Sequence, residues 1–241
     1  MNFRFIIIVL LGIPLSKFSL AQNNEFNCGS PFTDKRDGRD YKTVRIGSQC
    51  WMAENLNIGD RISTVKDQRD NNIIEKHCYD NDDHYCGIYG GLYQWNEVMQ
   101  YDTAESAQGI CPDGWHVPSD SEWCRLVTFL DQTVDCGIFG VSGDSIGGLL
   151  RGAGIVEKHT GLWHYPNRDA SDIAGFDAIP AGTRSIYAKF YYLGHHGYFW
   201  TSTAEDRLNA WFYYLKYSNT GIYREHYFKR SGYSVRCVLD R

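Results

Sequence analysis

One stretch of the chain, residues 161–172, combines aromatic rings with amide and carboxylate oxygens. Aromatic faces stack on sugar rings, while these oxygens bind hydroxyl groups or a hard cation such as calcium. The pattern therefore predicts a glycan site in which calcium can take part. The alternative is structural, because a tryptophan can pack in the core and Asn and Asp side chains commonly cap turns. The residues that would form the site are Trp163, Tyr165, Asn167, Asp169 and Asp172.

Motifs for catalysis are missing from the sequence. It contains no G-x-S-x-G elbow, no P-loop and no dinucleotide fingerprint. The eight histidines show no spacing typical of metal ligands or of a nucleophile's partner. The acidic run between Cys78 and Cys86 lacks the glycine and the distal glutamate of an EF-hand, and it predicts a solvated loop. We therefore expect a protein that is not an enzyme.

The cysteines indicate an oxidising compartment. An even number of them in an exported chain implies disulfides, although eight cysteines allow 105 pairings. No C-x2-C pair occurs, which disfavours a zinc site. Short separations allow Cys78 to close a loop with Cys86 and Cys124 to close one with Cys136. The eight are Cys28, Cys50, Cys78, Cys86, Cys111, Cys124, Cys136 and Cys237.

The first 21 residues have the pattern of a signal peptide. A short positive start precedes the apolar run of residues 5–15, and small residues predict cleavage after Ala21. The run is short for a membrane span, so an uncleaved anchor is the less favoured alternative. We predict a tail over residues 22–40 and one domain over residues 41–241. The mature chain is expected to be secreted or held in the cell envelope, either periplasmic or at the cell surface, and not integral to the membrane.

Composition narrows the choice of partners. Cleavage removes two basic residues and leaves 22 basic against 29 acidic side chains, a net charge of −7. Such a balance disfavours a general nucleic-acid binder. The 17 tyrosines and 7 tryptophans suit sugar or protein recognition, because their rings bury area while a polar tip stays wet. Most of them are nevertheless expected to lie in the core.

Two helices and several strands must position these residues. Apolar spacing predicts a first helix over residues 92–101. The second helix, over residues 119–130, begins with Ser119 and Glu122 at capping-box spacing. Residues 137–200 are rich in glycine and weakly patterned, which predicts a long loop. The expected strands cover residues 41–46, 49–52, 198–203, 209–217, 222–227 and 232–238.

Several segments together resemble the Fibrobacter succinogenes major paralogous domain, a family common in exported proteins of Fibrobacteres and Bacteroidetes. They include Cys-Pro-Asp-Gly-Trp-His-Val-Pro at 111–118 and Phe-Trp-Thr-Ser-Thr at 199–203. The family is similar in layout to C-type-lectin-like folds, including the formylglycine-generating sulfatase-modifying group. The resemblance implies an α+β fold with two helices packed on small twisted antiparallel sheets, long irregular loops and disulfide staples. The other matching segments are residues 41–47, 51–56, 78–82, 89–95 and 234–238.

Cysteine pairing is a further implication of the resemblance. The longest implied bond closes a loop of more than a hundred residues, which the chain-entropy estimate values at roughly 4–5 kcal/mol. The resemblance implies Cys111–Cys237 and Cys78–Cys86, and with these assigned, Cys28–Cys50 and Cys124–Cys136 are favoured for the remainder.

Three functions fit the sequence to different degrees. The favoured one is an exported, disulfide-stabilised, lectin-like binding module that engages a glycan or a surface protein at the bacterial envelope. The alternative is a structural or tip subunit of a surface assembly. A formylglycine-generating-like oxidase is less favoured, because it needs a reactive cysteine pair in the C-terminal half. Only Cys237 lies beyond Cys136 there. No cofactor is expected apart from the optional calcium.

Overall fold

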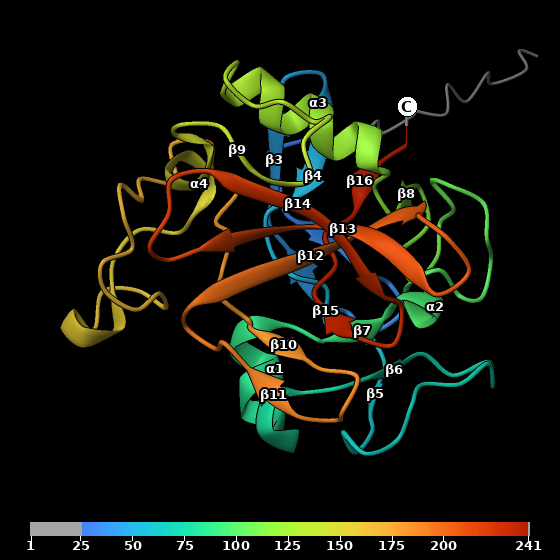
Figure 1. The fold of residues 1–241 in the computed structure, drawn as a ribbon. Coiled ribbons are helices and arrows are strands. Elements are labelled where there is room, and N and C mark those ends of the chain that lie inside the picture. Colours follow the sequence, from blue (N-terminus) through green and yellow to red (C-terminus); the bar gives the residue numbers. More distant parts are fainter. Residues whose placement is uncertain (1–25, 241) are drawn as a thin grey trace, which may run out of the picture.

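A computed structural model describes residues 26–240, so the predicted signal peptide lies outside the described part of the chain. Within this range the chain forms three four-stranded and two two-stranded sheets, connected by short helices and irregular loops. Figure 1 shows the largest sheet across the centre, with the longest helix above it and a small sheet below it. The presence of helices together with small, mostly antiparallel sheets confirms the predicted α+β class.

The largest sheet is built from the C-terminal third of the chain. It has the order β12-β13-β14-β9 and every pair is antiparallel. Side chains alternate between its two faces along each strand. Phe199 and Tyr213 therefore face one way, while Tyr198, Phe212 and Tyr214 face the other. The strands are β12 (His196–Ala204), β13 (Asn209–Lys216), β14 (Ile222–Phe228) and β9 (Gly140–Ser142).

Helix α3 (Asp120–Leu130), whose start the capping-box pattern predicts, covers one face of this sheet. The Ser119 hydroxyl accepts a hydrogen bond from the Glu122 amide, and the Glu122 carboxylate accepts one from the Ser119 amide. Trp123 stacks on Tyr213 with the ring centroids 5.2 Å apart. The helix is therefore capped at its start and anchored by one fully buried indole.

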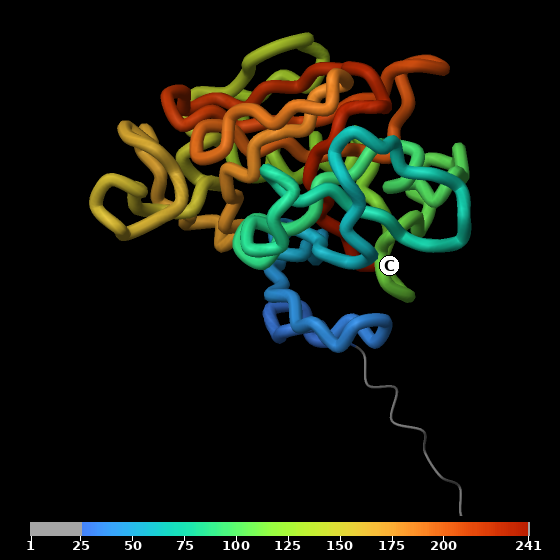
Figure 2. Tube along the Cα trace, turned by 90° about the horizontal axis from the view of Figure 1, so that it is seen from below, coloured from blue at the N-terminus to red at the C-terminus, as the bar shows by residue number. Residues whose placement is uncertain are grey.

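The smaller sheets bring distant segments together. The N-terminal hairpin β3 (Thr43–Ile46) and β4 (Gln49–Met52) joins β16 (Val238–Leu239) and β8 (Trp115–His116). In Figure 2 the N-terminal part of the described chain, coloured blue, lies at one side of the domain. The third four-stranded sheet contains β11 (Phe190–Tyr191), β10 (Thr183–Arg184), β15 (Gly232–Tyr233) and β7 (Tyr93–Gln94). The two-stranded sheets are β1 (Phe32–Thr33) with β2 (Asp40–Tyr41), and the parallel pair β5 (Asp60–Arg61) with β6 (Glu75–Lys76).

The first predicted helix is shorter than expected. Only α2 (Trp95–Val98) forms within residues 92–101. The residues predicted to form the first turn of the helix instead belong to strand β7, where Tyr93 pairs with Tyr233. At the other end, Gln100 and Tyr101 have positive φ angles of 48° and 63°, which stop a right-handed helix. The pairing of Tyr93 with Tyr233, which are far apart in the sequence, thus prevents the helix that the local apolar spacing predicts.

The predicted acidic loop contains helical structure, which corrects the expectation. A 3-10 turn, η1 (Tyr79–Asn81), leads into α1 (Asp83–Tyr89). The Asp82 carboxylate accepts a hydrogen bond from the His84 amide and so caps the helix. An acidic side chain at this position favours the positive end of a helix. The acidic run begins a helix in addition to facing solvent.

Residues 137–200 also contain more regular structure than predicted. They hold β9, α4 (Ile146–Leu150), η2 (Val156–Lys158), β10, β11 and the start of β12. The Asp131 carboxylate accepts hydrogen bonds from the amides of Ser145 and Ile146 at the start of α4. Because this capping group comes from outside the segment, its own sequence does not reveal the helix.

All eight cysteines are paired, as the resemblance implies. The Cα–Cα distances of the four bonds lie between 5.0 and 5.9 Å, which is ordinary disulfide geometry. Four disulfides indicate a chain that folds in an oxidising, extracytoplasmic compartment. Over residues 26–240, none of the helices has the length and apolar character needed to cross a membrane. The bonds are Cys28–Cys50, Cys78–Cys86, Cys111–Cys237 and Cys124–Cys136.

Candidate binding site

A tyrosine-lined cavity lies on the face of the large sheet opposite α3. The strand register places Tyr198 opposite Tyr214 and Phe212 opposite Glu225. Residues two apart on a strand share a face, so Tyr227 lies on the same side as Glu225. The pleat of three neighbouring strands therefore forms one wall of the cavity.

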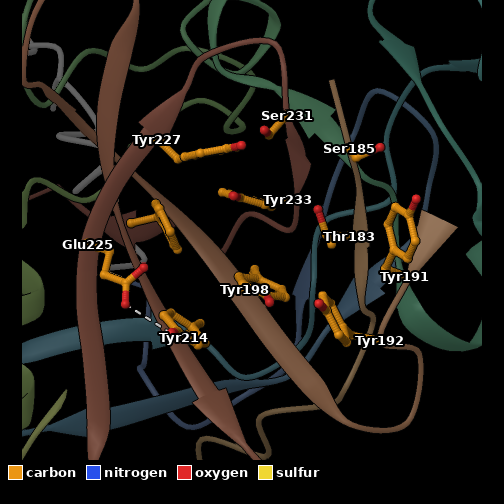
Figure 3. Close-up of a pocket in the computed structure, with 11 residues that line it drawn as sticks. Thr183, Ser185, Tyr191, Tyr192, Tyr198, Tyr214, Glu225, Tyr227, Ser231 and Tyr233 are labelled. Atoms are coloured by element: carbon orange, nitrogen blue, oxygen red, sulfur yellow. Dashed lines mark hydrogen bonds between the residues drawn. The ribbon is translucent and has the colours of Figure 1, made fainter. Parts of the chain in front are cut away.

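The second wall comes from the β10–β11 hairpin and the approach to β15. Figure 3 shows side chains from both walls converging on a common space. The cavity volume is about 240 Å³. Strand β15 pairs with β10, and its neighbour Ser234 bridges to Phe199 in β12, which holds the two sheets together. The residues of this wall are Thr183, Ser185, Tyr191, Tyr192, Ser231 and Tyr233.

Stacked tyrosines form the floor. Tyr198 lies between two nearly parallel rings, with its centroid 5.0 Å from that of Tyr233 and 4.9 Å from that of Tyr214. Tyr223 continues the stack, with its centroid 4.5 Å from that of Tyr214. Parallel aromatic packing of this kind fixes the rings and stabilises the fold. The floor is thus rigid and aromatic, with hydroxyl groups at the ring ends.

Three further tyrosines surround the opening and remain accessible. Tyr191, Tyr192 and Tyr227 are 43%, 51% and 45% exposed. Tyr192 is held by His196, whose ring lies parallel to it at a centroid distance of 4.5 Å. An exposed, oriented ring of this kind can contact the apolar face of a ligand without first being ordered.

Polar groups in the cavity retain capacity for hydrogen bonds. Glu225 accepts a hydrogen bond from the Tyr214 hydroxyl at 3.0 Å. Ser231 is 1% exposed, and its hydroxyl is enclosed beside Tyr233. Thr183 donates to the Gly232 carbonyl, and the Ser185 hydroxyl accepts from a backbone amide of its own turn. A ligand with several hydroxyl groups could bond the second Glu225 oxygen and the hydroxyls of Thr183 and Ser185.

The protonation states suit donor chemistry. Burial raises the pKa of Tyr198, Tyr214 and Tyr233, and the Glu225 charge adds to the effect at Tyr214. These phenols therefore keep their protons and act as donors at neutral pH. Burial also lowers the pKa of His196 to about 4, helped by the Lys216 charge. Neutral His196 has Nδ1 2.8 Å from the Tyr198 hydroxyl, which positions that phenol.

Two of the five residues singled out in the sequence are buried and make internal contacts. Trp163 is 1% exposed, and its indole donates to the Ala178 carbonyl at 2.9 Å. Asn167 accepts from the Arg151 guanidinium at 3.0 Å and donates to the Gly152 carbonyl. Asn167 thereby links the buried Arg151 guanidinium to the backbone at Gly152.

The other three differ in exposure. Tyr165 is 70% exposed, and Asp169 is also exposed. Asp172 is half-buried and accepts a hydrogen bond from the Asp177 amide at 2.7 Å. Burial raises the pKa of Asp172 to about 6. Across residues 26–240, no three His, Cys, Asp or Glu side chains are grouped closely enough to hold a metal.

Sequence reasoning did not identify the cavity. Its tyrosines come from β11, the following turn, β12, β13, β14 and β15, which are separated in the sequence. The only signal was the alternation of aromatic residues in the last third, such as Tyr198 with Trp200 and Phe212 with Tyr214. Alternation shows that residues share a face, but it does not show that this face borders a cavity.

A separate titratable cluster ties the end of the chain to α3. His116 Nδ1 lies 2.6 Å from Asp240, and Nε2 lies 3.1 Å from Glu122. Burial alone would raise the pKa of Glu122, but hydrogen bonds from His116 and Ser119 lower it to about 2. Both ring nitrogens of His116 are occupied by carboxylates, so the arrangement acts as a structural link between segments.

Comparisons with known proteins identify one family. A family model described as the Fibrobacter succinogenes major domain matches residues 44–239, a range that contains α3 and every residue lining the cavity. No curated protein matches the chain. No solved structure matches it either.

Proposed function

The chain belongs to the Fibrobacter succinogenes major domain family, and from this premise we propose that it is an exported binding module whose tyrosine-lined cavity takes a glycan. The observation that carries the proposal is the group of exposed rings at the opening, Tyr191, Tyr192 and Tyr227. Such rings stack on the apolar faces of sugars, while the phenols and hydroxyls beneath them bond sugar hydroxyl groups. Pockets of this mixed type are typical ligand sites.

The proposal includes a lectin-like fold. Its support is the return of the chain's last strand to the N-terminal hairpin, where β16 pairs with both β4 and β8. A long segment of loops between α3 and β12 is the second feature that supports a lectin-like layout. This segment supplies Tyr191 and Tyr192 to the cavity. In this arrangement the disulfides and α3 provide a rigid support and the irregular segments provide the site.

The cell envelope is the proposed location. The four disulfides favour an extracytoplasmic chain, and a signal-like N-terminus predicts export. A surface-facing glycan or glycoprotein is the partner that this location makes available. All eight cysteines are in disulfides, which disfavours the oxidase alternative, because that chemistry needs a reactive cysteine pair.

The test is direct binding with a matched pair of variants. The oxidised protein is screened on a glycan array, and hits are measured by titration calorimetry. Tyr192→Ala is expected to weaken binding about tenfold, the loss of one aromatic stacking contact. The control is Tyr187→Ala, because Tyr187 is 77% exposed in the same hairpin but does not line the cavity.

The control variant should bind like the wild type. If no glycan binds, or if both variants bind equally well, the cavity is not the glycan site. Thermal unfolding of each variant separates a loss of binding from a loss of fold.

A structural subunit of a surface assembly is the second candidate. The edge strand β9 and the residue before it carry exposed apolar side chains. Val141 in the strand is 44% exposed, and Phe139 before it is 58% exposed. An uncovered edge strand can pair with another chain. Light scattering of the wild type and of Val141→Lys tests this. A concentration-dependent oligomer that the lysine variant abolishes would support assembly, and a monomer at every concentration would count against self-assembly through this edge.

A further inference from the structure

The cavity has an uneven charge. Of the eleven residues that line it within the described chain, Glu225 is the one with a formal charge at neutral pH. The remaining lining side chains are tyrosines, one phenylalanine and three aliphatic hydroxyls. The faces of the rings carry partial negative charge as well. The interior is therefore negative in character, and it favours neutral or cationic groups over anionic ones.

Glu225 has an oxygen available for a ligand. Its Oε1 accepts from the Tyr214 hydroxyl at 3.0 Å, whereas none of the described residues donates to Oε2. In Figure 3 the carboxylate points into the group of labelled residues, with Tyr191 on the opposite side. A carboxylate that is held by one phenol and keeps a second oxygen free is pre-organised to accept a charged hydrogen bond.

The two nearest cations on the large sheet do not pair with Glu225. Lys216 has its ammonium 4.1 Å from the centre of the Tyr223 ring. Arg224, the next residue before Glu225 on β14, faces the other side of the sheet and pairs with Asp120 at 2.7 Å. Among residues 26–240, no Lys or Arg forms an ion pair with Glu225. Glu225 thus has no direct ion-pair partner in the described part of the chain, although the Lys216 ammonium lies 5.5 Å from the centre of the Tyr214 ring, so a ligand cation can bond it directly.

From this arrangement, and resting on the proposed glycan function, we propose that the cavity selects an amino sugar with a free, protonated amine. The ammonium bonds the free oxygen of Glu225 and lies against tyrosine faces, which attract cations. The phenol and aliphatic hydroxyls that line the cavity bond ring hydroxyls of the same sugar. An N-acetylated sugar lacks the charge, and a uronic acid carries the opposite one.

The experiment compares three oligosaccharides that differ at one position: a β-1,4-linked glucosamine tetramer, its N-acetylated form and the corresponding glucose tetramer. Calorimetry is done at a pH that keeps the amine protonated. The wild type is expected to bind the glucosamine tetramer about tenfold or more tightly than the other two, the ratio for one charge-assisted hydrogen bond. Added salt should reduce that ratio.

Glu225→Gln provides the matched variant, because it keeps an acceptor for Tyr214 and removes the charge. It should bring the ratio close to one, while Glu205→Gln, an exposed change in the turn between β12 and β13, should leave it intact. The inference is overturned if the wild type shows no preference or if Glu225→Gln retains it. Neutral sugars that bind through Tyr192 without amine preference would remove this inference alone. No binding of any sugar would remove the proposed function as well.

Discussion

The two faces of the large sheet use the same strands for different ends. On the α3 side, Phe199 and Tyr213 pack against Trp123 in a closed cluster. On the other side, Tyr198 and Tyr214 form a stacked floor beneath an open cavity. Adjacent residues of one strand thus belong to a sealed core and to an accessible site. The difference lies in what covers each face, since the strands themselves are shared.

What covers the sealed face includes the loop that the sequence analysis selected as a site. Trp163 and Phe176 both belong to the cluster beneath α3. The guanidinium carbon of Arg151 lies 5.6 Å from the centre of the Trp163 ring, and the guanidinium donates a hydrogen bond to Asn167. The covering loop on the other face instead leaves Tyr191 and Tyr192 at the rim of a space. One irregular loop therefore closes one face of the sheet, while another borders an opening on the other face.

The largest expected effect concerns the disulfides that accompany the two faces. Cys111–Cys237 lies in the cluster on the cavity side and spans 126 residues, whereas Cys124–Cys136 ties α3 to the loop that follows it and spans 12. Replacing both cysteines of the long bond by alanine should cost about 5 kcal/mol, against about 3 kcal/mol for the short bond, by loop-closure entropy. Urea unfolding of both double variants gives the two values. Equal losses would show that loop length does not set this difference.

The next effect tests the sealed face directly. Trp123→Ala should destabilise the fold by about 3–5 kcal/mol, because it empties a fully enclosed site against Trp51, Phe199 and Tyr213. Phe129→Ala on the same helix is the control. Phe129 is 64% exposed, so its loss should cost about 1 kcal/mol or less. Similar values for the two variants in chemical denaturation would contradict the sealed-core description.

These contrasts also show how far the sequence predicts the structure. The cap of α3 and the β3–β4 hairpin follow from residues close together, so local patterns predict them. The helix over 92–101 was predicted too long because Tyr93 pairs with Tyr233, and the sequence carries no local mark of such a pairing. The cavity requires two sheets to meet, which depends on the whole topology. The glycan and calcium role of the 161–172 stretch stays a prediction.

A smaller effect should come from Asp172 in the loop that closes the sealed face. Burial raises its pKa to about 6, so the folded protein binds a proton that the unfolded chain releases above about pH 4. Stability from this group is present below pH 4 and is lost as the pH rises towards 6. Asp172→Asn keeps the acceptor for the Asp177 amide and removes the charge. It should stabilise the fold by about 1–2 kcal/mol at pH 7, discounted for partial exposure, and by much less at pH 4.

Asp169→Asn, at an exposed position in the same loop, serves as the control and should change stability little at either pH. Thermal unfolding at the two pH values measures both variants. A destabilised Asp172→Asn at pH 7 would show that the charged form is needed there. If calcium raises the unfolding temperature of the wild type and this variant abolishes the gain, the loop holds the cation.

The smallest effect on stability is expected at the cavity rim. Tyr192 is 51% exposed and its main contact is the parallel ring of His196. Tyr192→Ala should therefore cost about 0.5–1 kcal/mol, far less than Trp123→Ala, although both remove an aromatic ring that stacks within the domain. Denaturant unfolding of the two variants under one condition measures the ratio. A loss at Tyr192 as large as that at Trp123 would mean that the rim ring supports the fold. A small loss together with weakened sugar binding would mean that the exposed tyrosines are held in place for a ligand, because their removal then costs binding without costing the core.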